Sequence, residues 1–458
     1  MPVQSTRIKL LNDAEIRKGD YVLYWMQQSQ RAAYNHALEY AVQQANKLGQ
    51  PLLVGFGLTD DYPEANLRHY TFMLEGLKET RETLASRGIK MLLRRGHPPE
   101  VALDLGRRAS MTICDRGYLR HQRAWRREVA KRAQCPVVQV ESDVVVPLEV
   151  VSEKAEYAAR TIRPKIHRHL ATYLVGFRQT AVKHPSLELR VKEIDLDNIE
   201  NLLQNLKLDR SIPPVSDLFK GGTSQAKKRF DEFSRHRLMC YDDHGNQPQT
   251  DDISHMSPYL HFGQISSLYL ALKISRVADS LKTVRDAYIE QLIVRRELAM
   301  NFTFFTPDYD AYTCIPGWAQ KTLAEHEHDQ RDYIYSRRQL ENAATHDAYW
   351  NASMLEMKHT GFMHNYMRMY WGKKILEWSR TPQKAFRTTL AINNKYFLDG
   401  RDPNSCTGVA WIYGVHDRAW TERPIFGKTR YMAASGLERK CDIAAYVKKV
   451  DGLAKKVS

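Results

Sequence analysis

The stretches Tyr21-Val-Leu-Tyr-Trp-Met26 and Pro51-Leu-Leu-Val-Gly-Phe-Gly-Leu58 decide the fold of the N-terminal part. Each is a short apolar run of strand length, and Arg31–Leu48 between them has the length and composition of a helix. Apolar runs that alternate with helices of about 10–20 residues are typical of βαβ units around a parallel sheet. The sequence therefore predicts an α/β domain with a doubly wound parallel sheet.

The same alternation continues to about residue 145. Further strands are predicted at Ile89–Arg94, Met111–Asp115 and Val137–Val140, and further helices at Leu67–Arg87, Pro99–Ala109 and Arg120–Ala133. No GxGxxG motif follows the first strand, so a Rossmann dinucleotide site is not indicated. A small chromophore bound to this domain would lie at the carboxyl ends of the strands.

The pattern changes after this domain. Residues 180–225 are polar and irregular, which predicts a linker with a short helix. The rest of the chain is almost entirely helical in pattern, with turns marked by Thr306-Pro, Ile315-Pro-Gly, Thr381-Pro and Asp402-Pro. We therefore expect an α/β domain at 1–178, a linker at 179–225 and an all-α domain at 226–458.

Composition narrows the class of partner. The chain of 458 residues has a formal net charge of +15, which favours a polyanion partner, although a basic solvated surface gives the same balance. Nucleic acid is favoured over a membrane because no segment approaches about 18 consecutive apolar residues. Six scattered cysteines without a CxxC pair exclude a zinc ribbon and indicate reduced thiols. The N-terminus lacks a signal-peptide pattern, so we expect an intracellular, cytoplasmic protein. We also expect a monomer.

The stretch Trp350–Trp378 says most about function. It reads WNASMLEMKHTGFMHNYMRMYWGKKILEW and contains three of the eight tryptophans of the chain. Trp371 and Trp378 are seven residues apart, so on a helix they share a face about 11 Å apart along the axis. Aromatic and Met residues at helical spacing are commonly just core. However, His364, Asn365 and Arg368 lie in the same block and are costly to bury without partners, which a cofactor would supply.

Three other segments carry polar groups of interest. Thr250–Gly263 places Ser254 and Ser257 before a helical run, where exposed N–H groups and hydroxyls suit a phosphate, although an ordinary N-cap has the same pattern. Tyr288–Phe302 sets Gln291, Arg295 and Asn301 around an apolar helix, which suits an anion or a structural salt bridge. Gly414–Met432 mixes cations with Trp420, Phe426 and Tyr431, as a protein that grips phosphates and stacks on bases would require.

Several other kinds of site are not supported. His326-Glu-His328, His167-Arg-His169 and the pair His359/His364 lack HExxH geometry, so no metal site is predicted. No GxSxG elbow and no Walker loop occurs, so acyl transfer and P-loop phosphoryl transfer have no support.

Taken together, the segments resemble the photolyase/cryptochrome family, and more narrowly its class II members, which act on cyclobutane pyrimidine dimers. Gly361–Met369 resembles the family motif G-[FW]-M-H-N-x-x-R-M, and Ser254–Gly263 resembles S-x-[LM]-S-P-Y-L-x-F-G, a flavin-phosphate loop. The class II signatures EELIVRREL..NF and GxHDxxWxERxIFGKxRYMN match residues 290–302 and the segment from Gly414. The resemblance covers nearly the whole chain and implies an α/β antenna domain, a linker and a helical flavin domain.

The resemblance implies FAD as cofactor, and a deazaflavin, a folate or no chromophore in the antenna domain. The residues of this chain that match cofactor-binding positions of the family are Tyr241, Ser254, His255, Met256, Ser257, Arg295, Asn365, Arg368 and Asp399. Asn365 and Arg368 match positions beside the isoalloxazine ring, and Asp399 matches the carboxylate that pairs with Arg368. Asn393 is our candidate for the contact to flavin N5. A cationic and amide environment would favour the anionic reduced ring.

The implied mechanism is light-driven repair without net redox change. Excited reduced FAD gives an electron to a dimer flipped from the duplex, the cyclobutane ring splits, and the electron returns. Trp411 matches the aromatic residue that packs on the dimer, and Met369 matches a methionine that faces the substrate. Trp371, Trp350 and Trp378, in that order from the flavin, resemble the class II relay that re-reduces oxidised flavin. UV-damaged DNA is the expected partner, held by Arg418, Trp420, Arg423, Lys428 and Arg430.

Two positions depart from the class II pattern. Gln291 stands where the family has its active-site glutamic acid, which hydrogen-bonds the dimer carbonyl and stabilises its radical anion. Glutamine keeps a donor and an acceptor but has no carboxylic proton, so we expect weaker repair with dimer binding largely retained. Ala433 replaces the terminal Asn of the pattern. Alternatives are a cryptochrome-like photoreceptor, expected to have a longer C-terminal extension, and a non-catalytic basic DNA-binding protein; a (6-4) photolyase is disfavoured by the class II signatures.

Overall fold

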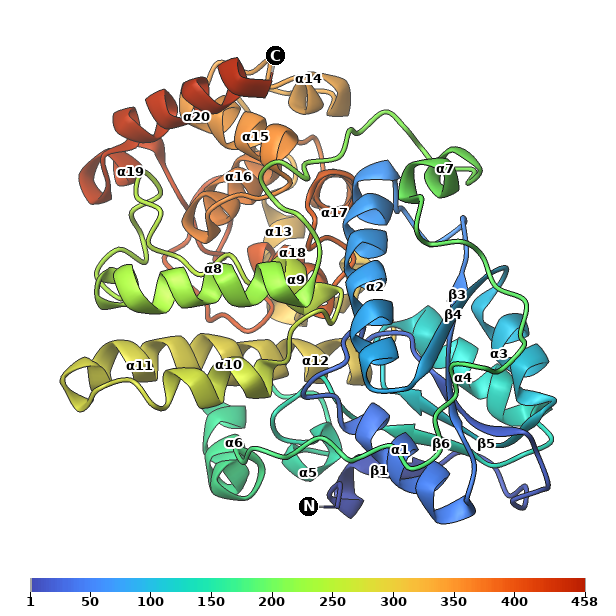
Figure 1. Ribbon diagram of the computed structural model, residues 1–458. Coiled ribbons are helices and arrows are strands. Elements are labelled where there is room, and N and C mark those ends of the chain that lie inside the picture. Colours follow the sequence, from blue (N-terminus) through green and yellow to red (C-terminus); the bar gives the residue numbers. More distant parts are fainter. Residues whose placement is uncertain (1, 458) are drawn as a thin grey trace. The chain divides into compact units, whose positions relative to one another are not determined.

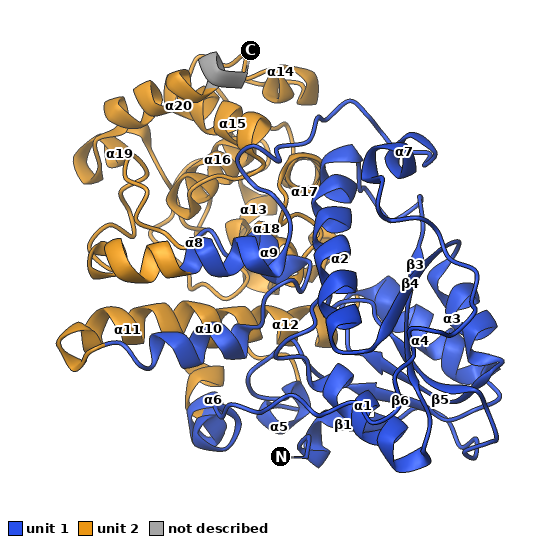
Figure 2. Ribbon diagram, in the orientation of Figure 1, with its two compact units in different colours: residues 1–153, 165–230, 255–277 blue, residues 154–164, 231–254, 278–458 orange. Residues whose placement is uncertain are grey.

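The computed structural model describes residues 2–457, which group into two compact units. One, here called the α/β unit, comprises residues 1–153, 165–230 and 255–277. The other, the helical unit, comprises residues 154–164, 231–254 and 278–458 (Figure 2). The chain passes several times between the units, and α6 (Ala159–Tyr173) and α8 (Thr223–His236) contain residues of both. The domain and linker boundaries expected from the sequence stay a prediction.

The α/β unit contains a six-stranded sheet of order β1-β6-β5-β2-β3-β4. Its strands are β1 (Ile8–Leu10), β2 (Tyr21–Trp25), β3 (Leu52–Leu58), β4 (Lys90–Arg95), β5 (Ala109–Asp115) and β6 (Val137–Val140). All neighbours are parallel except β1, which pairs antiparallel with β6 at the edge. The strand order reverses between β2 and β5, because β3 and β4 lie to one side of β2 and β5 and β6 to the other.

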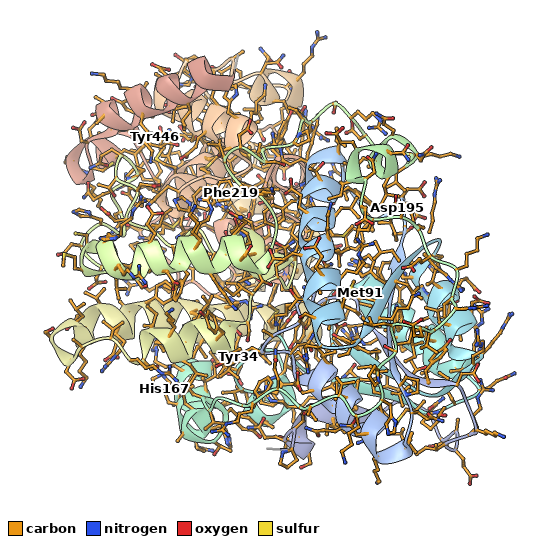
Figure 3. The ribbon with its side chains drawn as sticks, viewed as in Figure 1. Tyr34, Met91, His167, Asp195, Phe219 and Tyr446 are labelled. Carbon is orange, nitrogen blue, oxygen red and sulfur yellow. The ribbon has the colours of Figure 1, made fainter. Side chains whose placement is uncertain are left out.

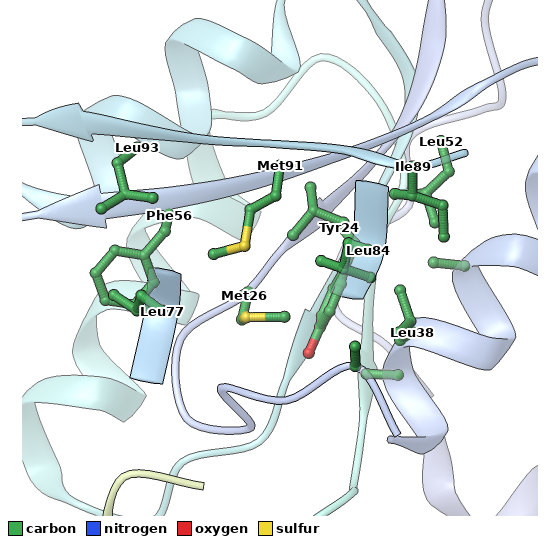
Figure 4. Packing of buried hydrophobic residues seen from close by; sticks show 14 of the residues in the cluster. Tyr24, Met26, Leu38, Leu52, Phe56, Leu77, Leu84, Ile89, Met91 and Leu93 are labelled. Carbon is green, nitrogen blue, oxygen red and sulfur yellow. The ribbon is translucent and has the colours of Figure 1, made fainter. Parts of the chain in front are cut away.

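Both faces of the sheet are covered by helices. Tyr24 and Met91 pack on one face with Leu38 of α1 (His36–Leu48) and Leu77 of α2 (Leu67–Ser86), as Figure 4 shows. Odd-numbered residues of β2 pack on the other face with Leu105 of α3 (Pro98–Gly106), and α4 (Arg120–Arg132) covers the same side. A strand buried on both faces needs apolar residues at successive positions, which is why the runs were visible in the sequence. The predicted doubly wound α/β fold is confirmed.

Two local differences have simple causes. Strand β1 has only three residues and its burial pattern is mostly exposed, so it lacks the apolar run of a buried strand. Helix α1 begins at His36 and not at Arg31, because the Asn35 side chain caps it by accepting a hydrogen bond from the Leu38 N–H at 3.1 Å. Arg31 is instead buried beside Asp143, with a distance of 3.0 Å between Nη1 and Oδ1.

The carboxyl ends of β2 and β5 meet at the point where the strand order reverses. There the buried Asp115 carboxylate accepts the backbone N–H groups of Gln27, Gln28 and Ser29, the last at 2.7 Å, and the Tyr24 hydroxyl at 3.1 Å. Burial raises the pKa of Asp115 and the backbone donors act in the opposite direction. These amides, which could have bound an anion, are satisfied by the protein itself.

The remaining helices of the α/β unit are short. They are α5 (Leu148–Val151), α7 (Ile199–Gln204), α9 (Ser257–His261) and α10 (Ser267–Ile274). Helix α7 lies within the segment predicted to contain a short helix. Helix α9 has only five residues, and Gly263 after it adopts a φ of +64°, so the apolar run that follows Ser257 forms two helices and not one.

The helical unit contains α16 (Asn365–Glu377), which is labelled in Figure 1. Its other helices are α11 (Lys282–Ile289), α12 (Arg296–Phe305), α13 (Gly317–Glu325), α14 (Arg337–Glu341), α15 (Ala348–Thr360), α17 (Pro382–Tyr396), α18 (Pro403–Ile412), α19 (Ala434–Lys440) and α20 (Ile443–Val457). Helices α15, α17 and α18 contact α16. Gly372 permits the approach of α18, because a Cβ there would lie 2.0 Å from Ile412 Cδ1.

The predicted turn signals lie at helix ends. Thr381 and Asp402 cap α17 and α18 with their side chains, each followed by a proline at the first helical position. Helix α12 ends at Phe305, immediately before Thr306-Pro307. Tyr446 of α20, labelled in Figure 3, donates its hydroxyl proton to Glu356 of α15 at 2.6 Å. Across residues 2–457, we find no helix with the length and apolar character that crossing a membrane requires.

Candidate functional site

The stretch Trp350–Trp378 forms two helices joined by a short turn. Helix α15 ends at Thr360 and is capped by Gly361, whose φ of +70° is the left-handed conformation that favours glycine. His364 then caps α16, because its Nδ1 accepts the Tyr366 N–H at 3.2 Å. Asn365 is exposed at the first position of α16, and Trp378 follows the last. The block that carried the family motif is therefore the turn and the first half of α16.

Arg368 of α16 is held in a bidentate ion pair. Its two terminal nitrogens lie 3.0 Å from the two carboxylate oxygens of Asp399, and its Nε donates to the Met363 carbonyl at 3.0 Å. The guanidinium lies 3.9 Å from the centre of the Phe397 ring. The structure thus brings together Arg368 and Asp399, which are 31 residues apart in the sequence, and fixes the plane of the guanidinium.

Asn393 of α17 is buried close to the end of its helix. Its amide nitrogen donates to Asn394 Oδ1 at 2.9 Å and to Ser405 Oγ at 2.7 Å. Both amide protons are therefore used within the protein, which leaves the Oδ1 atom as the group that can accept a hydrogen bond. In this arrangement Asn393 is an acceptor for a bound N–H or O–H donor.

An aromatic series connects α16 with the surface of the helical unit. The Trp350 indole N–H donates to the Trp371 carbonyl at 2.9 Å, and the Trp350 and Trp378 ring centres are 5.6 Å apart. Trp371, Trp350 and Trp378 are all buried. The Trp378 ring lies 5.3 Å from that of Tyr335, whose hydroxyl is 2.8 Å from His346 Nδ1. Sequence reasoning missed Tyr335 and His346, which lie outside every recognised motif.

Tyr241 and Ser254 are neighbours through Tyr288. The Tyr288 hydroxyl donates to Ser254 Oγ at 3.1 Å, and the Tyr241 and Tyr288 ring centres are 5.3 Å apart. Burial raises the pKa of Tyr241 to about 12 and also raises that of Tyr288, so both hydroxyls stay protonated. Phe233 packs on both rings. Sequence reasoning gave Tyr288 no role, although it begins the stretch Tyr288–Phe302 and lies two residues before the recognised signature.

Residues Glu290–Arg295 form a π-helical turn between α11 and α12. Glu290 pairs with Arg163, whose Nε lies 2.9 Å from Oε2, and with Arg295, whose Nε lies 3.2 Å from Oε1. Burial alone would raise the pKa of Glu290, but the hydrogen bonds and charges of Arg163 and Arg295 outweigh it and lower the pKa. Gln291 and Arg295 are exposed on this turn. Turns of this kind occur frequently at functional sites, and nothing in the apolar pattern signals them.

Cations and aromatic rings alternate in the segment that follows α18. The Arg430 guanidinium lies 5.5 Å from the Trp411 ring centre and 4.9 Å from that of Trp420, and Arg418 lies 5.0 Å from Trp420. Arg423 lies 5.0 Å from the Tyr431 ring. The segment folds back on itself, because the Trp420 N–H donates to the Lys428 carbonyl at 2.8 Å.

Exposure in this segment suits contact with a polyanion. Arg418, Trp420, Arg423 and Lys428 are exposed, whereas Arg430 and Trp411 are half-buried. Arg430 thus contacts both the exposed Trp420 ring and the half-buried Trp411 ring. The segment therefore combines cations that can bind phosphates with rings that can stack on bases. The predicted DNA-binding residues and Trp411 are therefore brought together.

Three remaining predicted residues belong to the α/β unit, and one to α16. Met256 is buried and precedes α9, Ser257 is the first residue of α9, and His255 adopts a φ of +53°. Ser257 does not cap the helix, since Met256 occupies that position. Met369 is half-buried, one residue after Arg368.

Comparison with known proteins gives a consistent family. Residues 22–186 match the family model described as DNA photolyase. A curated protein named deoxyribodipyrimidine photo-lyase from Methanothermobacter thermautotrophicus is 48% identical over 98% of this chain and 99% of its own length. One of the same name from Arabidopsis thaliana is 38% identical over 98% of this chain and 94% of its own length.

The fold has matching solved structures. A bacterial class III photolyase from Agrobacterium tumefaciens superposes with a TM-score of 0.72 at 18% identity, covering 95% of this chain and 87% of that one. At this identity the match supports the fold, and the identity to the curated relatives supports the family. The chain belongs to the DNA photolyase family.

Proposed function

We propose that the chain repairs cyclobutane pyrimidine dimers in DNA under light, with FAD as its cofactor. The family implies FAD, and relatives that cover almost the whole chain are named deoxyribodipyrimidine photo-lyase. The observation that carries the proposal is the composition of α16. The helix holds Arg368 in its ion pair with Asp399 and, one turn further along, Trp371 in the buried aromatic series.

The polar groups of the helical unit fit a flavin. When bound, reduced FAD supplies on excitation the electron that splits the cyclobutane ring. Arg368 places a cation beside the site and so favours a negatively charged ring, while Asp399 keeps the guanidinium in one orientation. Asn393 offers an acceptor, which suits the reduced ring because N5 carries a proton in that state and lacks one in the oxidised state. Asn365 adds a further amide at the start of α16.

Hydroxyls and a cation are proposed to bind the phosphates and ribose. Tyr241 and Ser254 present neutral O–H groups, since burial keeps the tyrosine protonated, and Arg295 supplies a positive charge. Ser257, Met256 and His255 of the α/β unit are kept as cofactor-binding candidates on the family resemblance alone. A deazaflavin or folate-type antenna chromophore is proposed for the α/β unit.

On the substrate side, the flipped dimer is proposed to pack on Trp411 and to face Met369 and Gln291. Arg430 holds Trp411 by a cation–π contact and, with Arg418, Arg423 and Lys428, neutralises phosphates of the flanking duplex. Trp420 supplies an exposed ring on which a base can stack. Because Glu290 is tied to Arg163 and Arg295, Gln291 is the polar group of that turn left to meet the dimer.

Trp371, Trp350 and Trp378 are proposed to return the cofactor to its reduced form by passing electrons inward. The contact of the Trp350 indole with the Trp371 carbonyl and the 5.6 Å separation of the Trp350 and Trp378 rings support this order. Tyr335 extends the series to a residue whose hydroxyl can lose its proton to His346 on oxidation.

The test is to illuminate the reduced protein with an oligonucleotide that contains a thymine dimer and to follow the recovery of thymine absorbance. Recovery that depends on light supports the proposal. The specific feature that favours a second candidate, a light sensor on the same fold, is Gln291 in place of the family acid. Normal flavin content without recovery, in this chain and in Gln291→Glu, would favour the light sensor.

A further inference from the structure

Three side chains of the types that bind metals meet in the helical unit, outside the residues assigned above. Cys240 ends the 3₁₀ turn Leu238–Cys240, His244 follows one turn later, and Asp252 lies eight residues further along. Their ligand atoms all lie within 4.8 Å of one another, and His244 Nδ1 is 2.5 Å from Asp252 Oδ2. The spacing C-x3-H-x7-D matches none of the usual metal motifs, so no sequence pattern indicated this cluster.

The backbone sets this geometry. The His244 N–H donates to the Cys240 carbonyl at 2.8 Å, which makes one turn of helix and puts both side chains on one face. The second half of the loop is anchored by Lys449, whose Nζ donates to the carbonyls of Pro248 at 3.2 Å and Thr250 at 3.0 Å. The ligand types are therefore held together by contacts that involve no metal.

The charge of the segment suits a cation. Residues 240–252 contain four aspartates and no lysine or arginine, in a chain whose net charge is +15. Arg237 pairs with Asp251, whereas the neighbouring Asp252 contacts His244. The side chains of His244 and Asp252 are 36% and 22% exposed, so an ion can enter from solvent.

We propose that Cys240, His244 and Asp252 bind one divalent metal ion of the zinc class. A sulfur, a nitrogen and an oxygen ligand are the donors that Zn²⁺ takes in tetrahedral sites, with the fourth position left to water. The ion joins the two ends of the loop that carries Tyr241 and leads to Ser254, so its role is to stiffen this loop. The site is independent of the repair reaction proposed above.

The first experiment measures metal in the full-length protein without a histidine tag, grown with added zinc and desalted. We expect about one zinc per chain by mass spectrometry, and X-ray absorption with one sulfur at about 2.3 Å and nitrogen or oxygen at about 2.0–2.2 Å. This measurement uses the unchanged chain, so it does not depend on how a variant folds. A protein without zinc, or zinc without a sulfur neighbour, would overturn the proposal.

The second experiment compares variants with a matched control. Cys240→Ser and His244→Gln should lose the metal, whereas Cys314→Ser, at another half-buried cysteine outside the cluster, should keep it. Cobalt in the oxidised protein should give visible d–d bands at wavelengths longer than those that oxidised flavin absorbs, and the bands should vanish in Cys240→Ser. Equal metal content in Cys240→Ser and Cys314→Ser would show binding elsewhere and reject the assignment.

Discussion

At the scale of single residues, Gln291 is the position where the chain departs most informatively from its family. Its neighbour Glu290 cannot take over the role of an acid, because Arg163 and Arg295 hold it as a carboxylate. We predict that Gln291→Glu raises the rate of ring splitting relative to the competing return of the electron about tenfold, a rate ratio that corresponds to about 1.4 kcal/mol, and so raises the repair yield of the reduced protein. Dimer binding should change little. The measurement is dimer repair per absorbed photon in the two proteins.

A third variant separates the contributions at this position. Gln291→Ala removes the amide, which still donates and accepts hydrogen bonds, so its repair should fall below that of the parent. Equal yields in Gln291 and Gln291→Glu would show that a carboxylic proton has no role here.

Trp371 is the second residue whose role can be isolated. Phenylalanine keeps the apolar volume but is far harder to oxidise than tryptophan, so Trp371→Phe should abolish the photoreduction of oxidised flavin. Repair by chemically pre-reduced protein should persist. Flavin absorbance under illumination with an external reductant gives the first quantity, and thymine recovery gives the second. Trp318→Phe, a half-buried tryptophan of α13, is the matched control and should photoreduce normally. Photoreduction in both variants would return Trp371 to a packing role.

At the scale of elements, α16 contains a buried lysine, Lys373, for which we find no salt bridge among the described side chains. Lys373 donates to the Ile412 carbonyl and lies 5.9 Å from the Trp411 ring, and burial lowers its pKa to about 7. The positive charge of Arg430 also lowers the pKa of Lys373, whereas the negative charge of Asp417 raises it. Its unfolded value is near 10.4, so between about pH 7 and 10.4 the unfolded chain holds the proton that the folded chain has lost. Stability should therefore rise with pH in this window.

The variant that tests this is Lys373→Met, which fills similar volume without a charge. It should be more stable than the parent at pH 7, and the rise in unfolding midpoint between pH 7 and 9 should shrink. Lys374→Met is the control. Lys374 pairs with Glu377 at 2.7 Å, so this variant should be less stable than the parent. An unchanged pH slope in Lys373→Met would show that Lys373 titrates normally.

Whether a helix or strand could be predicted from the sequence depends on whether its side chains face the core or the solvent. The strands of the sheet were visible because both faces are buried, whereas β1, short and mostly exposed, carried no signal. The π-helical turn at Glu290–Arg295 differs from an α-helix only in its hydrogen bonds, so an apolar pattern cannot reveal it. The pair of Arg368 and Asp399 came from the family resemblance, since no local rule joins residues so far apart. The meeting of Cys240, His244 and Asp252 depends on a loop closure that only the structure shows.

At the scale of the whole molecule, the charge of +15 is unevenly useful, because a cation contributes to binding only where it meets a phosphate. Arg418 and Arg423 are exposed beside rings that can stack on bases, and the exposed Lys428 belongs to the same segment, which sets these three apart from cations scattered over the surface. Each phosphate contact releases counterions, so the salt dependence of the binding constant counts the contacts.

We predict that replacing these three cations with glutamine reduces the magnitude of the slope of log K against log salt by about 3. Binding to damaged and to undamaged duplexes should weaken to a similar degree. The control exchanges Lys18, Arg127 and Lys131, exposed cations of the α/β unit, and changes the net charge by the same amount. If net charge alone drives binding, the salt dependence should fall by the same amount in both triple variants. If the segment after α18 grips the phosphates, only the first variant should show this fall, while flavin content stays equal in both. Fluorescence anisotropy at four or more salt concentrations distinguishes the two outcomes.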